Sequence, residues 1–203
     1  MGVWGHERWS LDLQWRREWF HGEMHQFQSH LSMELGSKKA SQSNSSRSSS
    51  DRWAFHVFLS FRGEDTRKTF ADHLYVALQQ KGIKTFRDDE EIAKGEVISF
   101  QLPKAIEESL SYVVILSPNY ASSTWCLNEL QQILESRKKL GREVFPIFYG
   151  VDPSHVRHQK GSFEKAMTNH EERFGKDNEK IKGWRAALKE IATISGWVDT
   201  QYP

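Results

Sequence analysis

Short apolar runs alternate with amphipathic stretches along most of this chain. The runs lie at 56–61 (HVFLSF), 83–86 (IKTF), 112–116 (YVVIL) and 144–149 (VFPIFY), and they are rich in the residues that favour strands. Between them, apolar residues recur at helical spacing over 66–81, 98–110, 125–140, 163–174 and 181–194. Strands that alternate with helices predict an α/β domain with an open parallel sheet and helices on both faces.

The pattern also predicts details of these elements. It places four strands, and a fifth is expected to begin at Trp197. The run 112–116 is almost continuously apolar, which predicts a central strand covered on both faces. Pro146 indicates an edge or a bulge in its strand, and Pro103 should start or kink its helix. Gly82 and Gly196 are expected to end helices.

The first 52 residues differ in composition from the rest. Their tryptophan-rich start fits helical spacing and strand alternation equally well. The serine-rich tract 40–50 is typical of a flexible linker because it cannot bury a core. Three histidines at 21, 25 and 30 have no Cys or carboxylate cluster to complete a metal site, so no metal is expected. We therefore expect a disordered extension over 1–52, a folded domain over 53–198 and a tail over 199–203.

Charge and cysteine content limit the function classes. The 28 basic and 27 acidic residues leave a net charge of +1, so neither nucleic acid nor an anionic membrane is an expected partner. The single cysteine, Cys126, excludes an internal disulfide and suits a reducing compartment. No apolar run approaches membrane-spanning length, and the start has no signal-peptide apolar region. A cytoplasmic protein is expected, with the nucleus as a further compartment.

Candidate chemistry gathers where the strands should end. The first strand breaks into Arg62 and Gly63, at the sheet edge where open α/β folds build ligand sites. Arg62 could bind a phosphate or orient a carboxylate, and a surface ion pair with Glu64 or Asp65 is the alternative. Gly63 permits a tight turn there.

Glu129 is the candidate carboxylate on the helix 125–140. It lies about 100° from Leu130, on the flank of the buried face, and Trp125 precedes it by one turn on the same flank. A carboxylate beside a large aromatic suits a nucleoside, whereas a solvated acid on a helix surface is the alternative. Glu129 has no basic residue three or four positions away, unlike Glu135.

Four motifs, taken in their order along the chain, resemble those of plant-type Toll/interleukin receptor (TIR) domains. They are FHVFLSFRGEDTRKTFADHL at 55–74, GIKTFRDDEEIAKGEVI at 82–98, AIEESLSYVVILSPNYASSTWCLNELQQI at 105–133 and PIFYGVDPSHVRHQKGSF at 146–163. The resemblance covers nearly all of 53–198 and implies a flavodoxin-like sheet of four to five strands. It also implies self-association and, for many members, cleavage of NAD+ at the nicotinamide–ribose bond to give ADP-ribose or its cyclic isomers in defence and cell death. NAD+, or NADP+, would then be the substrate, with no cofactor or metal implied.

The same resemblance assigns roles to single residues. Glu129 matches the catalytic glutamate of the family's WCxxEL motif. Asp88 and Lys94 lie in a loop that closes over the ligand in relatives, and a mobile solvated loop is the alternative. The expected substrate-binding residues are Arg62, Gly63, Asp88, Lys94 and Trp125.

Two sets of residues resemble family surfaces for self-association. Asp72 and His73 stand where the family carries a Ser-His pair used in TIR–TIR contacts, and the Asp in place of Ser leaves the detail of that contact open. Gly161 begins a second such surface. For both, ordinary helix surface and tight-turn packing are the alternatives.

Three function classes compete. The first is an NAD+ nucleohydrolase or ADP-ribosyl cyclase activated by TIR self-association, and the second is a non-catalytic adaptor that only recruits other TIR domains. The third, a response-regulator-like phosphoacceptor, needs an acidic pocket where this chain has Ser60, Phe61 and Arg62. The presence of Arg62, Trp125 and Glu129 favours the enzyme. Cys126 has no paired histidine and is interpreted as a small buried residue.

Overall fold

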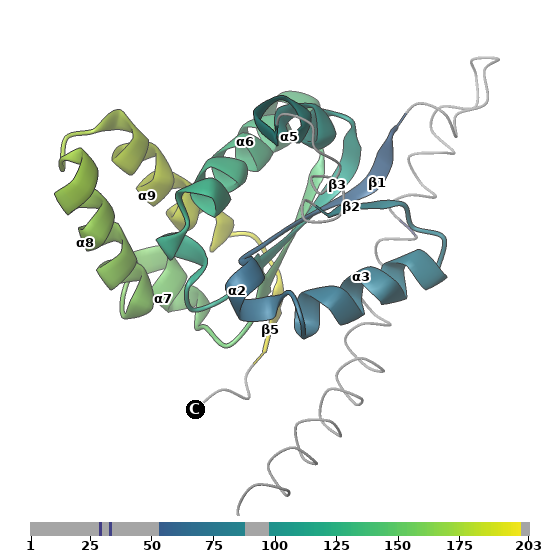
Figure 1. Ribbon diagram of the computed structural model, residues 1–203, viewed down its shortest axis with the longest axis horizontal. Coiled ribbons are helices and arrows are strands. Elements are labelled where there is room, and N and C mark those ends of the chain that lie inside the picture. The colour runs from purple at the N-terminus through teal and green to yellow at the C-terminus, as the bar shows by residue number, and fades with distance from the viewer. Residues whose placement is uncertain (1–28, 30–32, 34–52, 88–97, 200–203) are drawn as a thin grey trace, which may run out of the picture. The chain divides into compact units, whose positions relative to one another are not determined.

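The computed structural model describes residues 29, 33, 53–87 and 98–199 of the 203-residue chain (Figure 1). The expected extension over 1–52, the tail beyond 199, and the loop residues Asp88 and Lys94 therefore lie largely or wholly outside the described residues. In chain order the elements are β1 (Phe55–Phe61), α2 (Gly63–Thr66), α3 (Phe70–Gln80), β2 (Thr85–Arg87), α5 (Ile98–Glu107), β3 (Ser109–Leu116), the 3-10 turn η3 (Tyr120–Ser122), α6 (Thr124–Leu140), β4 (Glu143–Phe148), α7 (Pro153–His158), α8 (Ser162–Phe174), α9 (Glu179–Ile191) and β5 (Trp197–Val198).

Within the described ranges, five strands form one parallel sheet in the order β2-β1-β3-β4-β5. The predicted α/β fold and the fifth strand at Trp197 are confirmed. The third strand, β3, is central and buried along its whole length, as its apolar run predicts. Chain order reverses between β1 and β3, and in this class of sheet ligands bind at the carboxyl ends of strands at such a point.

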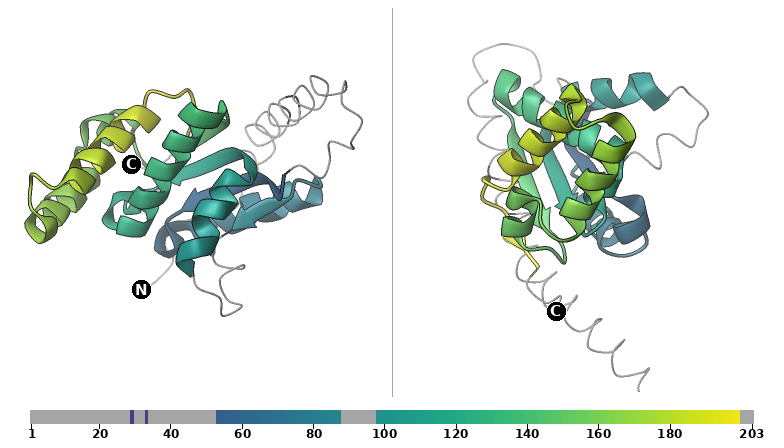
Figure 2. Two further views of the ribbon diagram at one scale, coloured as in Figure 1. Left: turned by 90° about the horizontal axis from the view of Figure 1, so that it is seen from above. Right: turned by 90° about the vertical axis from the view of Figure 1, so that its left-hand side faces the viewer.

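Helices cover the two faces of the sheet unequally. The main core lies under α5, α6 and α9, and alternate residues of β3, such as Tyr112, Val114 and Leu116, point into it. The helix α3 lies on the opposite side of the sheet from α5 and α6 (Figure 1). From another angle, α6 and α9 remain side by side (Figure 2), in line with their dense contacts.

Two predicted helix boundaries are wrong. The helix expected over 66–81 begins only at Phe70 as α3, and a separate short helix, α2, precedes it and ends at Thr66. The last helix ends at Ile191 rather than at Gly196. At Gly196 a side chain would collide with the carbonyl oxygen of Pro146, so this glycine permits a close approach between the chain and β4.

Neither proline interrupts its element. Pro103 lies inside α5, which continues through it from Ile98 to Glu107. Pro146 lies opposite Val114 of β3, while β5 pairs only with the two residues that follow it, Ile147 and Phe148. Because proline has no N–H to donate, the strand next to it pairs only beyond that position.

Two findings about the described residues bear on function. None of the helices there is long and apolar enough to cross a membrane. No cluster of three or more His, Cys, Asp or Glu side chains in the same ranges could hold a metal ion.

Candidate functional site

Glu129 lies near the start of α6, beside the carboxyl end of β1. The helix begins after Ser123, whose Oγ accepts a hydrogen bond from the backbone N–H of Cys126 at 3.2 Å. The Glu129 residue is only 2% exposed. The alternative interpretation of Glu129 as a solvated surface acid is therefore wrong. A buried carboxylate requires polar partners, because burial without them is costly.

A hydroxyl group from another element binds Glu129 directly, and a second hydroxyl is linked to it through the first. Ser60, in β1, donates its hydroxyl to Glu129 Oε2 at 2.7 Å. The phenol oxygen of Tyr120, in η3, lies 2.9 Å from Ser60 Oγ and 3.1 Å from the carbonyl oxygen of Cys126. We call Ser60, Tyr120 and Glu129 the hydroxyl–carboxylate cluster. The cluster connects β1, η3 and α6 beside the carboxyl end of β1.

Tyr120 stays a neutral phenol in this cluster. Burial raises the pKa of Tyr120 well above its usual value of 10.0, and the nearby Cys126 and Glu129 raise it further, whereas the hydrogen bond with Ser60 lowers it. A neutral phenol keeps its proton and can donate it. Sequence reasoning missed both hydroxyl residues, although Ser60 is a polar residue inside an apolar strand.

Arg62 follows β1 and forms the ion pair that was one of its two predicted alternatives. Its Nη2 lies 2.6 Å from Glu64 Oε2, and the side chains are 24% and 76% exposed. Its Nε is buried and has no hydrogen-bond partner. An exposed pair of this kind contributes about 0–1 kcal/mol, so little free energy is needed to exchange Glu64 for another anion.

Gly63 and Asp65 shape the turn after β1. The guanidinium group of Arg67 lies over Gly63, where an added Cβ would come within 2.5 Å of Arg67 Nη2. Asp65 accepts three hydrogen bonds, from Ser117 Oγ at 2.6 Å, from Asn119 N at 2.9 Å and from Asn119 Nδ2 at 3.1 Å. Asp65 thus fastens the end of β1 to the loop that leads into Tyr120. Its place in the polar stretch that follows β1 was visible in the sequence, but its partners were not.

Trp125 and Cys126 lie at the start of α6 with opposite exposure. Trp125 is 37% exposed and lies one helical turn before Glu129. Cys126 is buried, and its Sγ lies 3.6 Å from the carbonyl oxygen of Phe61. The interpretation of Cys126 as a small buried residue is confirmed.

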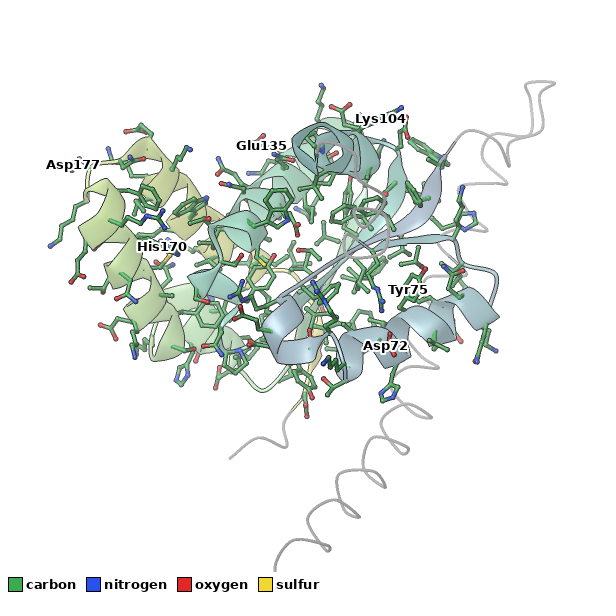
Figure 3. The ribbon with its side chains drawn as sticks, in the orientation of Figure 1. Asp72, Tyr75, Lys104, Glu135, His170 and Asp177 are labelled. Atoms are coloured by element: carbon green, nitrogen blue, oxygen red, sulfur yellow. The ribbon has the colours of Figure 1, made fainter. Side chains whose placement is uncertain are left out.

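Two hydrogen bonds brace this region from α8 and α9. Trp184 Nε1 donates to Asn128 Oδ1 at 3.0 Å, next to Glu129 in the chain. His170 Nε2 lies 2.9 Å from the carbonyl oxygen of Ala121 and donates to it, which ties α8 to the turn that carries Tyr120. Figure 3 shows His170 on α8. The His170 ring also packs edge-on against the Trp184 ring.

The predicted self-association residues lie on other elements. Asp72 projects from α3 beside Tyr75 (Figure 3), and its Oδ1 lies 2.8 Å from Arg87 Nη1. The guanidinium of Arg87 also stacks over the Tyr75 ring at 4.6 Å. His73 is exposed, and Gly161 precedes α8 with a φ of 61°, a conformation that favours glycine. The structure therefore groups Glu129, Trp125, Arg62 and Gly63 near one sheet edge and leaves Asp72, His73 and Gly161 elsewhere.

Comparison with known proteins gives consistent matches. The model of the family described as "TIR domain" matches residues 54–202. TMV resistance protein N of Nicotiana glutinosa is 55% identical over 156 residues, which are 77% of this chain and 14% of that protein. Disease resistance protein RPV1 of Vitis rotundifolia is 54% identical over 166 residues, which are 81% of this chain and 12% of that protein. The chain therefore spans only a small part of the length of these relatives.

One solved structure is similar in both sequence and fold. It is the structure of the TIR domains of the activated Roq1 resistosome, which directly recognises the pathogen effector XopQ. That chain is 52% identical to this one with a TM-score of 0.69, and the match covers 73% of this chain and 89% of that chain.

Proposed function

The chain belongs to the TIR domain family, and from this premise we propose that it is an NAD+ nucleohydrolase of the ADP-ribosyl cyclase type, with Glu129 as its catalytic residue. The observation that carries the proposal is the geometry of Glu129. Its carboxylate is buried beside the carboxyl end of β1 and accepts a hydrogen bond from Ser60, in a fold whose ligand sites lie at that edge.

The reaction suits a single carboxylate. Nicotinamide leaves NAD+ as a neutral ring, because the electron pair of the breaking C1′–N1 bond neutralises its positive charge, so no general acid is required. The ribose becomes oxocarbenium-like, as in glycoside hydrolysis. A carboxylate about 4 Å from that charge contributes about 4 kcal/mol at an effective dielectric constant of 20. That free energy corresponds to about a thousandfold in rate.

The fate of the oxocarbenium carbon decides the product. Attack by water on C1′ gives ADP-ribose and releases one proton to solvent. Attack by the adenine base or a ribose hydroxyl of the same molecule closes a ring instead and gives a cyclic isomer. Both outcomes need the same bond cleavage, so both would depend on Glu129.

The surrounding residues have roles that match parts of NAD+. The exposed ring of Trp125 would stack on a ribose or a base. Arg62 would exchange its exposed partner Glu64 for a phosphate of the substrate, for which guanidinium is well suited. Gly63, Asp88 and Lys94 complete the proposed substrate-binding set.

Self-association would switch the enzyme on in defence signalling. Two relatives are named as resistance proteins, and the Roq1 relative is described as TIR domains of a resistosome. We propose contacts between copies through Asp72 and His73 on α3 and through Gly161 before α8. In this role Asp72 would act together with Arg87, to which it is paired.

The test is NAD+ turnover by the purified chain held at high density on a scaffold. Wild type should consume NAD+, and Glu129→Ala should abolish consumption while it keeps the circular-dichroism spectrum of the folded protein. Glu135→Ala is the matched control, because Glu135 is an exposed acid on the same helix. Equal turnover by wild type and Glu129→Ala would refute the assignment. No turnover by any variant would favour an adaptor that acts through association alone.

A further inference from the structure

A buried serine interrupts the apolar run of β1. Ser60 is 1% exposed, and its Cα lies opposite Val114 in the central strand β3. An apolar side chain would suit such a position better, because a buried hydroxyl is costly unless it is hydrogen-bonded. The Ser60 hydroxyl meets this need through Glu129 and Tyr120 and through no backbone group that the structure records. The role of the Ser60 hydroxyl therefore lies in its contacts with Glu129 and Tyr120.

Counting protons fixes the direction of the hydrogen bond between Ser60 and an ionised Glu129. An ionised carboxylate can only accept, so the single proton of Ser60 lies toward Glu129 Oε2. The oxygen of Ser60 can then accept the proton of Tyr120, 2.9 Å away, for which the carbonyl oxygen of Cys126 at 3.1 Å is the other acceptor. Tyr120 to Ser60 to Glu129 is a chain in which both protons point toward the carboxylate, and such chains strengthen each member.

The same atoms allow a second arrangement when Glu129 carries a proton. Glu129 would then donate to Ser60, Ser60 to Tyr120, and Tyr120 to the carbonyl oxygen of Cys126, which lies 3.1 Å from the phenol. Each hydroxyl has a partner in both arrangements. The geometry therefore holds the side chain of Glu129 in one place whether or not it is ionised.

We propose that Ser60 and Tyr120 are positioning residues that fix the direction of the Glu129 carboxylate, with Ser60 acting directly and Tyr120 acting through Ser60. The catalytic consequence of this role rests on the function proposed above, whereas the positioning itself does not. The recorded hydrogen bonds of both hydroxyl groups are made within the hydroxyl–carboxylate cluster and to the carbonyl oxygen of Cys126, so neither residue is assigned a contact with the substrate. Their effect is on the geometry of Glu129, to which that contact is assigned.

Positioning predicts a specific kinetic pattern. Ser60→Ala should lower kcat about 30-fold and leave KM within about twofold, since a misplacement of about 1 Å can cost up to about a hundredfold. Tyr120→Phe should lower kcat about fivefold, because Ser60 remains and still donates. Ser60→Thr keeps the hydroxyl and should restore most of the loss. In the Ser60→Ala background, Tyr120→Phe should cause no further loss of kcat, because its route to Glu129 is already broken.

The chain contains a matched control for these variants. Ser136 and Tyr112 form a second buried serine–tyrosine hydrogen bond, 2.8 Å long, toward the other end of α6. Ser136→Ala and Tyr112→Phe remove the same chemical groups from the same core without touching Glu129. If the loss of a buried hydroxyl acted only through stability, the control pair would lower kcat as much as the Ser60 and Tyr120 variants do.

The experiment combines turnover with a measurement that needs no activity. The five single variants and the double variant are assayed for kcat and KM on the scaffold. In parallel, the 13Cδ resonance of Glu129 is followed by NMR at one pH in the full chain, assigned by its loss in Glu129→Gln. We expect this resonance to move in Ser60→Ala, to move less in Tyr120→Phe, and to stay in place in both controls.

The two readouts separate the two claims. If wild type fails to turn over NAD+, the proposed function is wrong, and the resonance of Glu129 alone decides the positioning role. If that resonance is unchanged in Ser60→Ala and in Tyr120→Phe, the positioning role is refuted, even when NAD+ is consumed. Tyr120→Phe keeps the shape of the core and decides the question if Ser60→Ala does not fold.

Discussion

The two ends of α6 each bury a charge beside a serine–tyrosine pair, but they bind it in different ways. At the far end, Arg142 Nη1 donates to the backbone carbonyl oxygens of Ile106 and Ser109 at 2.9 and 2.5 Å and to the Tyr112 phenol at 3.1 Å. Its guanidinium also stacks over the Trp53 ring at 4.5 Å. At the near end, Glu129 is bound by the side-chain hydroxyl of Ser60.

The difference shows how a fold separates stability from chemistry. Backbone carbonyls cannot rotate away, so Arg142 is fixed as a structural link between α5, β3 and the start of β4. A hydroxyl can reverse its hydrogen bond, so Glu129 keeps its place through a change of protonation or charge in its surroundings. The far end should therefore govern folding, and the near end should govern turnover.

The largest effect on stability should come from the far end. Arg142→Ala removes a donor from two buried carbonyl oxygens and leaves that of Ile106 with the Tyr112 phenol, and a buried polar group that loses its partner costs about 1–3 kcal/mol. We expect the free energy of unfolding to fall by about 3 kcal/mol in urea titrations. Turnover per folded molecule should stay within about twofold of wild type. A large loss of kcat in molecules that remain folded would break the division between the two ends.

Asp65 should affect both stability and turnover, because it links α2 to the loop that leads into Tyr120. Asp65→Ala removes the acceptor of three hydrogen bonds from Ser117 and Asn119. We expect a loss of about 2 kcal/mol in the free energy of unfolding. A roughly tenfold lower kcat should accompany it, because the loop before Tyr120 is released. Asp65→Asn, which keeps an oxygen acceptor, should recover part of the free energy of unfolding and part of kcat. A loss of stability without any change in kcat would contradict this role.

Trp125 should affect substrate binding and not stability. Its ring is partly exposed, and stacking of a base on an aromatic ring contributes about 1–3 kcal/mol. Trp125→Ala should therefore raise KM about tenfold while the melting temperature changes little. Trp125→Phe, which keeps an aromatic face, is the conservative control. An unchanged KM in the alanine variant would exclude Trp125 from the substrate site.

The smallest effect should come from the exposed pair at Arg62. Glu64→Gln breaks an ion pair that contributes about 0–1 kcal/mol, so stability should hardly change in the same urea titrations. Freed from its anion, Arg62 should bind the substrate phosphates better, and KM should fall about twofold. A rise in KM would mean that Glu64, rather than a phosphate, is the partner that Arg62 requires.

The fold was predictable because its signals are local. The apolar run of β3, the helical spacing of α6 and the strand at Trp197 could each be recognised within a few residues. Helix ends were less predictable, since the break between α2 and α3 has no proline or glycine to mark it. Gly196 was misinterpreted as the end of α9, because it serves a close contact with Pro146 that only the folded chain contains.

The site was only partly predictable, for a related reason. Helical geometry placed Glu129 beside the buried face of α6, but its depth depends on residues from two distant elements. Ser60 is 69 residues away along the chain, and Tyr120 reaches Glu129 only through Ser60. Likewise, the sequence left Arg62 with two possible partners, and the pairing with Glu64 depends on the turn that follows β1.

The most direct test of whether Glu129 is catalytic compares NAD+ turnover by scaffold-bound wild type, Glu129→Ala and Glu135→Ala. We expect Glu129→Ala to lose at least about a thousandfold of the activity of wild type, as the stabilisation of an oxocarbenium charge requires. Glu135→Ala should retain full activity, and all three proteins should melt cooperatively. Turnover by Glu129→Ala at the wild-type rate would contradict the catalytic role of this carboxylate.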